Sequence, residues 1–343
     1  MLASVGLLCA GAVPVTEGYV TGADGVRLFY RRLGSGADFV VFLHGGPGLS
    51  HLDGGPQIEP IAERHTLIPY GPARCGPLRV GQRSRPAHRQ RGARPGSAPG
   101  ATRHREDEAG LSWGSGLAAL YVQAHPDRVE RIVFLDPMPP ALKPFAQERE
   151  DKMKSALGPE RTARLRELAR QHAAARDEDL PAICREMDPI FFQPYLVDPA
   201  RYDRGRQGIC EVPPAVIRNA TVVAASVNRS LGDFDLRRAL ANLTVPALVI
   251  EGKRTIVPLD ATREWAKAPP DARLLLVAEA EHATFLDRPE AVIRAIEVFL
   301  GGEWPSAAKR VRRHAAPYRR PATSASLPRT RPEPASSRRG RGP

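Results

Sequence analysis

Two kinds of hydrophobic pattern alternate along the chain. Short runs rich in β-branched and aromatic residues predict strands at residues 18–32, 39–44, 132–135, 245–250 and 273–277. Apolar residues recur at helical spacing over residues 116–125 and 289–300. Continuous apolar runs are typical of strands buried on both faces, so the pattern predicts an α/β fold in which helices cover a sheet.

Residues 137–242 interrupt this alternation. They are amphipathic and charged, with the clearest helix at residues 161–175, and the strand pattern resumes only after them. We therefore expect a helical cap of residues 137–242, inserted between two halves of a core at residues 17–136 and 243–302.

The two ends of the chain fit neither pattern. Residues 1–12 are apolar and end in Ala-Gly-Ala, as before a signal-peptidase site, but they lack a basic start. Residues 1–16 are therefore interpreted as a signal remnant or a misassigned start, and we expect a cytoplasmic protein, or an exported one if a signal peptide is present. Residues 303–343 are rich in Pro, Ser and Arg, which predicts a disordered basic tail.

The formal charge of +12 is concentrated in two segments. Residues 304–343 hold eleven Lys and Arg against one acid, and residues 71–109 hold nine Arg against three acids, so the rest is mildly acidic. A polyanion-binding face usually spreads positive charge among aromatic residues, so we expect no nucleic-acid partner. The alternative, a basic polyanion-binding protein, predicts an affinity that falls steeply with salt. No apolar run is long enough to predict a membrane partner.

The four cysteines, Cys9, Cys75, Cys184 and Cys210, show no spacing that is typical of a metal site or a disulfide framework. We expect solitary structural thiols and no metal.

Two motifs indicate nucleophilic catalysis. Residues 110–114 read Gly-Leu-Ser-Trp-Gly and precede a predicted helix, as in a nucleophile elbow with Ser112 as the nucleophile. Residues 44–48 read His-Gly-Gly-Pro-Gly and follow a predicted strand, so the backbone amides of Gly45, Gly46 and Trp113 are candidates for an oxyanion hole. His282 follows the last predicted strand, where the Ser, Asp, His order places the base. An isolated surface histidine is the alternative for His282.

These motifs, together with residues 125–129 (His-Pro-Asp-Arg-Val) and 245–248 (Val-Pro-Ala-Leu), resemble the proline iminopeptidases and related α/β-hydrolases. The resemblance covers roughly residues 17–70 and 110–302. It implies a mostly parallel eight-stranded sheet with flanking helices, a helical cap and no cofactor. It also implies hydrolysis of a small peptide or ester through an acyl-enzyme, the usual substrate having an N-terminal proline.

The chain departs from the family pattern at the acid of the triad. The family's Gly-x-x-Asp-x-x-x-Pro corresponds to residues 252–258, which lack an Asp. We expect Asp136, at the end of a predicted strand, to serve as the acid, with Asp260 as the alternative. Glu281 stands where the family commonly has Gly. In the cap, Glu186 and Asp188 are candidates for binding a substrate amine, with solvated helix charges as the alternative.

Residues 71–109 also depart from the family pattern. Their start, Gly-Pro-Ala-Arg-Cys-Gly-Pro-Leu, equals the family's Asp-Gln-Arg-Gly stretch read with one extra G, so we hypothesise that the segment is translated out of frame, with the frame restored before Ser112. The strand before Ser112 would then be charged at residues 105–108, and we expect that it cannot be buried. The sequence thus predicts a proline iminopeptidase-like hydrolase, with a small-ester carboxylesterase and a catalytically defective homologue as alternatives.

Overall fold

The computed structural model describes residues 13–22, 25–72, 105–202 and 208–312. Its strands form one sheet in the order β1-β2-β4-β3-β5-β6-β7-β8. The strands are β1 (Val15–Thr21), β2 (Arg27–Leu33), β3 (Phe39–Leu43), β4 (Thr66–Pro72), β5 (Glu106–Leu111), β6 (Val129–Leu135), β7 (Ala247–Gly252) and β8 (Ala272–Val277). The β1–β2 and β2–β4 pairs are antiparallel and all others are parallel. The mostly parallel eight-stranded sheet is therefore confirmed.

The first predicted strand is two strands. The β1–β2 hairpin pairs Val15 with Leu33, and the chain turns at Gly25, whose φ of 80° suits a residue without a Cβ. We assigned residues 1–16 to a signal remnant or a misassigned start. Because β1 begins at Val15, the last two of these residues belong to the sheet. Residues 1–12 lie outside the described part.

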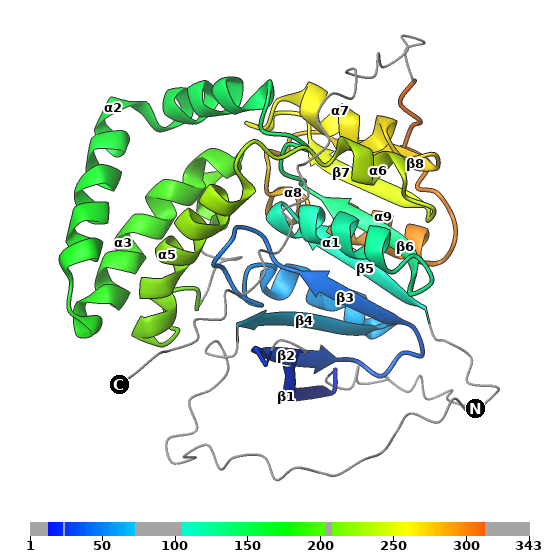
Figure 1. Cartoon of the computed structure of the whole chain (residues 1–343), viewed down its shortest axis with the longest axis horizontal. Helices are drawn as coiled ribbons and strands as arrows, with labels where there is room; N and C mark the ends of the chain where they lie inside the picture. Colours follow the sequence, from blue (N-terminus) through cyan, green and yellow to red (C-terminus); the bar gives the residue numbers. More distant parts are fainter. Residues whose placement is uncertain (1–12, 23–24, 73–104, 203–207, 313–343) are drawn as a thin grey trace, which may run out of the picture. The chain divides into compact units, whose positions relative to one another are not determined.

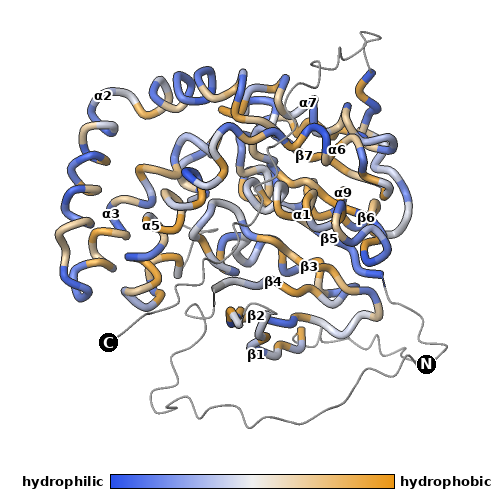
Figure 2. The backbone as a smooth tube through the Cα atoms, in the orientation of Figure 1, coloured by the Kyte–Doolittle hydropathy of each residue, from blue (hydrophilic) through white to orange (hydrophobic). Residues whose placement is uncertain are grey.

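Helices cover both faces of the sheet (Figure 1). One face packs on α1 (Trp113–Ala124), α6 (Arg237–Ala241) and α7 (Leu259–Lys267), and the other on α9 (Pro289–Leu300) and the 3₁₀ turn η2 (Glu59–Glu63). Alternate residues of one strand belong to opposite cores: Ile132 and Phe134 to the first, Val133 and Leu135 to the second. The need to fill both cores explains why the inner strands other than β5 are largely apolar, and Figure 2 shows them as mostly hydrophobic tubes.

The cap lies beyond the carboxyl ends of the parallel strands (Figure 1). Its main helices are α2 (Phe145–Ala174), which bends at Gly158, α3 (Leu180–Phe192) and α5 (Pro214–Leu231). Short 3₁₀ turns join them: η4 (Asp177–Asp179), η5 (Gln193–Tyr195) and η6 (Pro199–Arg201). The remaining short helices, η1 (Gly55–Gln57) and α8 (Thr284–Asp287), belong to core loops.

A disulfide joins two parts of the cap. Cys184 of α3 and Cys210, before α5, are bonded with their Cα atoms 5.7 Å apart, within a small apolar cluster that includes Leu180 and Ile217. The prediction of solitary thiols is therefore wrong for this pair. Packing of α3 against α5 brings together two cysteines whose spacing in the sequence has no recognisable pattern.

The strand β5 contradicts the expectation that a charged strand cannot be buried here. It pairs with β3 and β6 at the centre of the sheet, and Asp107 and Glu108 are only 5% and 3% exposed. Burial raises the pKa of Asp107 to about 7, partly offset by Arg131, and that of Glu108 to about 8. Burial of these groups is tolerated because Glu108 is mostly protonated at neutral pH, and Asp107 is partly protonated and lies 3.7 Å from the Arg131 guanidinium. Most of the anomalous segment, residues 73–104, lies outside the described part.

Residues 303–312, which we expected to belong to the disordered tail, pack on the core. Trp304 lies against Phe299 with ring centroids 5.0 Å apart, Ala308 is buried, and Lys309 forms a bridge with Leu274 of β8. Apolar side chains in an otherwise polar stretch allow this packing. Residues 313–343 lie outside the described part.

Candidate active site

Ser112 lies at the turn between β5 and α1. Its φ of 49° and ψ of −109° are strained for a residue with a side chain. A Cβ added at Gly110 would meet the backbone of Gly114, and one added at Gly114 would overlap the Leu43 carbonyl oxygen. The Ser115 hydroxyl donates to the Gly110 carbonyl oxygen at 2.6 Å and ties the turn together. The flanking glycines are therefore required by the close approach of three backbone segments.

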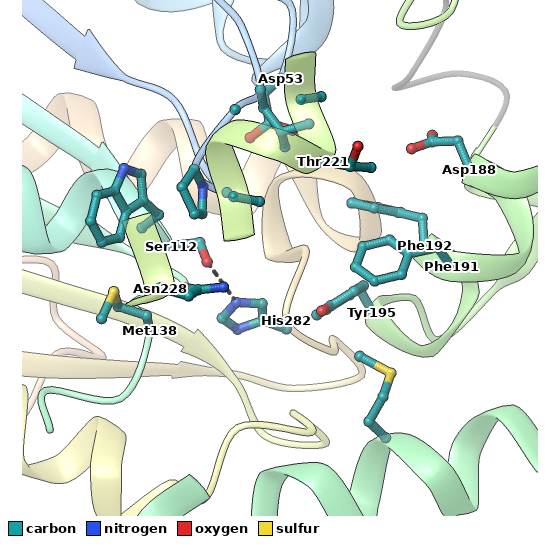
Figure 3. A pocket seen from close by; sticks show the side chains of 18 of the residues that line it. Asp53, Ser112, Met138, Asp188, Phe191, Phe192, Tyr195, Thr221, Asn228 and His282 are labelled. Atoms are coloured by element: carbon teal, nitrogen blue, oxygen red, sulfur yellow. Dashed lines mark hydrogen bonds between the residues drawn. The ribbon is translucent and has the colours of Figure 1, made fainter. Parts of the chain in front are cut away.

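His282 lies in the loop between β8 and α8, with its ring directed toward Ser112 (Figure 3). Its Nε2 is 3.3 Å from Ser112 Oγ, and the side chain is buried. The Tyr195 carbonyl oxygen accepts a hydrogen bond from the Ala283 amide at 3.0 Å, and the Tyr195 ring lies 5.5 Å from the imidazole. The structure thus brings together the predicted nucleophile and base.

Glu251, which the sequence reasoning missed, completes the chain of hydrogen bonds. Its Oε2 lies 3.2 Å from His282 Nδ1, and its Oε1 accepts from the Gly252 amide at 3.0 Å. The carboxyl is fully buried at the carboxyl end of β7. A carboxylate at Nδ1 fixes the imidazole orientation that leaves Nε2 to accept a proton. The signal in the sequence was a lone acid directly after the apolar run at residues 245–250.

Neither acid that we expected at the imidazole lies against it. Asp136 Oδ2 instead accepts from the Thr284 amide at 2.9 Å and from its hydroxyl at 3.0 Å. Burial and the neighbouring Glu251 charge raise the pKa of Asp136 well above its ordinary value. Asp260 is exposed and pairs with Arg263 at 2.7 Å. Because β7 lies between β6 and β8, an acid ending β7 is better placed for a loop that leaves β8.

The candidate oxyanion residues divide into two groups. Gly46, with a φ of 47°, and Trp113 line the same cavity as Ser112. The Gly45 amide instead donates to Asp53 Oδ2 at 2.7 Å, so it is committed to holding the loop. Asp53 is buried and was missed in the sequence, where no motif marks it.

A cavity of about 1010 Å³ separates the core from the cap. Ser112 and His282 line it from the core side, and Phe191, Phe192 and Tyr195 line it from the cap side (Figure 3). The arrangement places a nucleophile and a base at the wall of a partly open, mostly apolar cavity.

The two acids that we expected in the cap have different surroundings. Asp188 lines the cavity and accepts a hydrogen bond from the Tyr202 hydroxyl at 2.6 Å. Glu186 is half-exposed, is not among the cavity-lining residues and pairs with Arg164 at 2.6 Å. Only Asp188 is therefore placed where a bound molecule could reach it.

A family model described as the alpha/beta hydrolase fold matches residues 109–289, more than half of the chain. The chain belongs to the α/β-hydrolase fold family. It is also 24% identical over 297 residues to a proline iminopeptidase of Lacticaseibacillus rhamnosus (strain Lc 705), covering 83% of this chain and 98% of that protein.

Solved structures of hydrolases share the fold. The 2-hydroxy-6-oxo-6-phenylhexa-2,4-dienoate hydrolase of Rhodococcus sp. strain RHA1 has a TM-score of 0.56 at 18% identity, covering 84% of this chain and all of that one. The esterase RhEst1 of Rhodococcus sp. ECU1013 has a TM-score of 0.55 at 17% identity, covering 83% of this chain and 98% of that one. At these identities the likeness shows the fold.

In this α/β-hydrolase, Glu281 stands directly before the histidine. Burial raises the pKa of Glu281 to about 7, opposed by a hydrogen bond from the Ile256 amide. Its carboxyl is therefore only partly ionised at neutral pH and places less than a full negative charge beside His282.

Within the described ranges, no group of three or more His, Cys, Asp or Glu side chains could hold a metal ion. None of the helices in those ranges is both long and apolar enough to cross a membrane.

Proposed function

We propose that this α/β-hydrolase is a serine hydrolase that cleaves a carboxylic ester or amide through an acyl-enzyme. His282 Nε2 takes the proton of Ser112 as Oγ attacks the substrate carbonyl, and Glu251 stabilises the imidazolium that forms. The amides of Gly46 and Trp113 hold the oxyanion. His282 then protonates the leaving group and activates the water that releases the acyl group. The observation that carries the proposal is the buried chain of contacts from Ser112 through His282 to Glu251.

The first test is labelling of the purified protein with a fluorophosphonate probe, which reacts with an activated serine without needing the substrate. We expect the wild type to be labelled and Ser112→Ala not to be. Labelling of neither protein, with both cooperatively folded by circular dichroism, would instead establish the catalytically defective homologue.

Cleavage of an N-terminal proline is a second, finer candidate. It is supported by the similarity to a proline iminopeptidase, and by Asp188, a carboxyl at the cavity wall that could accept a substrate amine. Release of p-nitroaniline from prolyl-p-nitroanilide at a rate that falls at least tenfold in Asp188→Asn would support it. No release by a protein that the probe labels would exclude it.

Export is the localisation that we propose. The disulfide between Cys184 and Cys210 supports it, because such bonds persist in oxidising compartments and are rare in the cytosol. Fusion of residues 1–30 to a reporter that is active only outside the cytoplasm tests it, and a silent reporter would return the assignment to the cytoplasm.

A further inference from the structure

We infer that the cavity between core and cap takes carboxylic esters whose acyl group is large, apolar and uncharged, and that Phe191 determines this preference. The inference rests on the proposed serine hydrolase function and deepens it by naming the substrate class.

The size of the cavity supports a large acyl group. Its volume of about 1010 Å³ is at the upper end of the range for pockets that enclose a drug-sized molecule, roughly 300–1000 Å³. An acetyl group or a single prolyl residue would leave most of that space to water in contact with apolar walls. The free energy gained by removing those walls from water grows with the apolar area that the substrate covers.

The wall beside the candidate triad is aromatic. Tyr195 lies against the His282 ring, and its own ring centroid is 5.9 Å from that of Phe191 and 5.4 Å from that of Phe192. Phe191 lines the cavity, and 49% of its surface is exposed. A large aromatic side chain left uncovered in the same cavity as the nucleophile is apolar surface that a substrate can bury.

Three methionines, from both the core and the cap, also line the cavity. Met138 follows β6 in the core, and Met153 and Met187 belong to α2 and α3 of the cap, and all three line the cavity. Unbranched thioether side chains adapt to apolar groups of different shapes. The lining therefore favours apolar chains or rings in general over one rigid group.

The charged groups at the cavity already have partners. Asp53 accepts from the Gly45 amide, Asp188 accepts from the Tyr202 hydroxyl, and Glu150 forms an exposed ion pair with Lys154 at 2.5 Å. Arg149 contacts the Tyr195 hydroxyl at 3.4 Å. A charged acyl group that does not reach Asp188 or Arg149, which contact neutral hydroxyls, would lie unpaired against apolar side chains, which is costly.

The test compares three p-nitrophenyl esters that share a leaving group and differ only in the acyl chain: the acetate, the octanoate, and the mono-ester of suberic acid, whose eight-carbon chain ends in a carboxylate. We expect kcat/KM for octanoate to exceed that for acetate at least tenfold, and to exceed that for the charged suberate ester at least tenfold. One variant is Phe191→Ala. The control is Val222→Ala, which truncates an exposed apolar residue of α5 that is not among the lining residues.

In Phe191→Ala, the octanoate-to-acetate ratio should fall about tenfold, with probe labelling of Ser112 retained. In Val222→Ala, the ratio should stay at the wild-type value. A wild-type ratio near one, or an equal loss on both esters in Phe191→Ala, would overturn the inference while leaving the serine hydrolase function standing. Absence of probe labelling in the wild type would overturn both.

Discussion

At the scale of single residues, two buried carboxyls stand at neighbouring strand ends, and only one contacts the imidazole. The Asp136 amide donates to the Ile250 carbonyl oxygen at 2.8 Å, so Asp136 and Glu251 follow paired residues of β6 and β7. Two negative charges so close together in a buried site are unfavourable. Asp136 therefore keeps its proton and anchors the His282 loop through Thr284, while Glu251 faces the ring.

These different roles of Glu251 and Asp136 predict losses of kcat of very different size for two matched substitutions. Glu251→Gln should lower kcat by about 10⁴-fold, because the amide can no longer stabilise an imidazolium. Asp136→Asn should lower kcat by less than about tenfold, because the amide oxygen still accepts from Thr284 and no negative charge is removed. Steady-state kinetics on the preferred ester measures both. A larger loss in Asp136→Asn than in Glu251→Gln would make Asp136 the acid.

At the scale of one element, β5 holds a central place in the sheet despite its acids. A buried carboxyl whose pKa is raised binds its proton more tightly in the folded state than in the unfolded one. For Glu108 the pKa rises from 4.5 to about 8. The contribution of this carboxyl to the free energy of unfolding is therefore fully present below pH 4.5 and is lost as the pH rises through 8. The loss amounts to ~5 kcal/mol for a well-buried group.

Replacing this carboxyl with a hydrocarbon should therefore stabilise the protein in a pH-dependent way. Glu108→Leu should raise the melting temperature more at pH 9 than at pH 5, since only at pH 9 is the buried carboxyl charged. The control is Glu130→Leu, the same change at an exposed position of β6. Differential scanning calorimetry at the two pH values measures the gains, and an equal gain at both would contradict the raised pKa.

At the scale of the whole molecule, the described residues up to Val311 form one compact unit. Residues 313–343 carry eight arginines against one acid, whereas the cavity and its catalytic candidates belong entirely to that unit. Residues 313–343 therefore supply +7 of the net charge of +12, and residues 1–312 supply the remaining +5.

A chain ending at residue 312 should label with the fluorophosphonate probe as fully as the whole protein and melt within about 2 °C of it, because the packed segment at Trp304 and Lys309 is kept. Any salt-sensitive binding to heparin or DNA should weaken at least tenfold, because eight arginines that attract polyanions are removed while the nine in residues 71–109 stay. Binding that is unchanged by the truncation would place the polyanion site within residues 1–312.

The hypothesis of a shifted reading frame concerns residues 71–109. The family model begins to match at residue 109, where the hypothesis places the restored frame. Resequencing of the gene decides it, and a sequence without an insertion or deletion would exclude it.

The sequence by itself determined the fold class, the nucleophile candidate and the base candidate, because each is marked by local chemistry. A strand buried on both faces is usually apolar throughout, as β6 and β7 largely are, and a sharp elbow needs small residues around Ser112. The tertiary structure decided the acid, the role of Gly45, the disulfide and the burial of β5. Each of these depends on which segments meet in space: β7 lies beside β8, Asp53 folds back on its loop, and α3 packs against α5. Such contacts join residues far apart in the chain, and no pattern along the sequence records them.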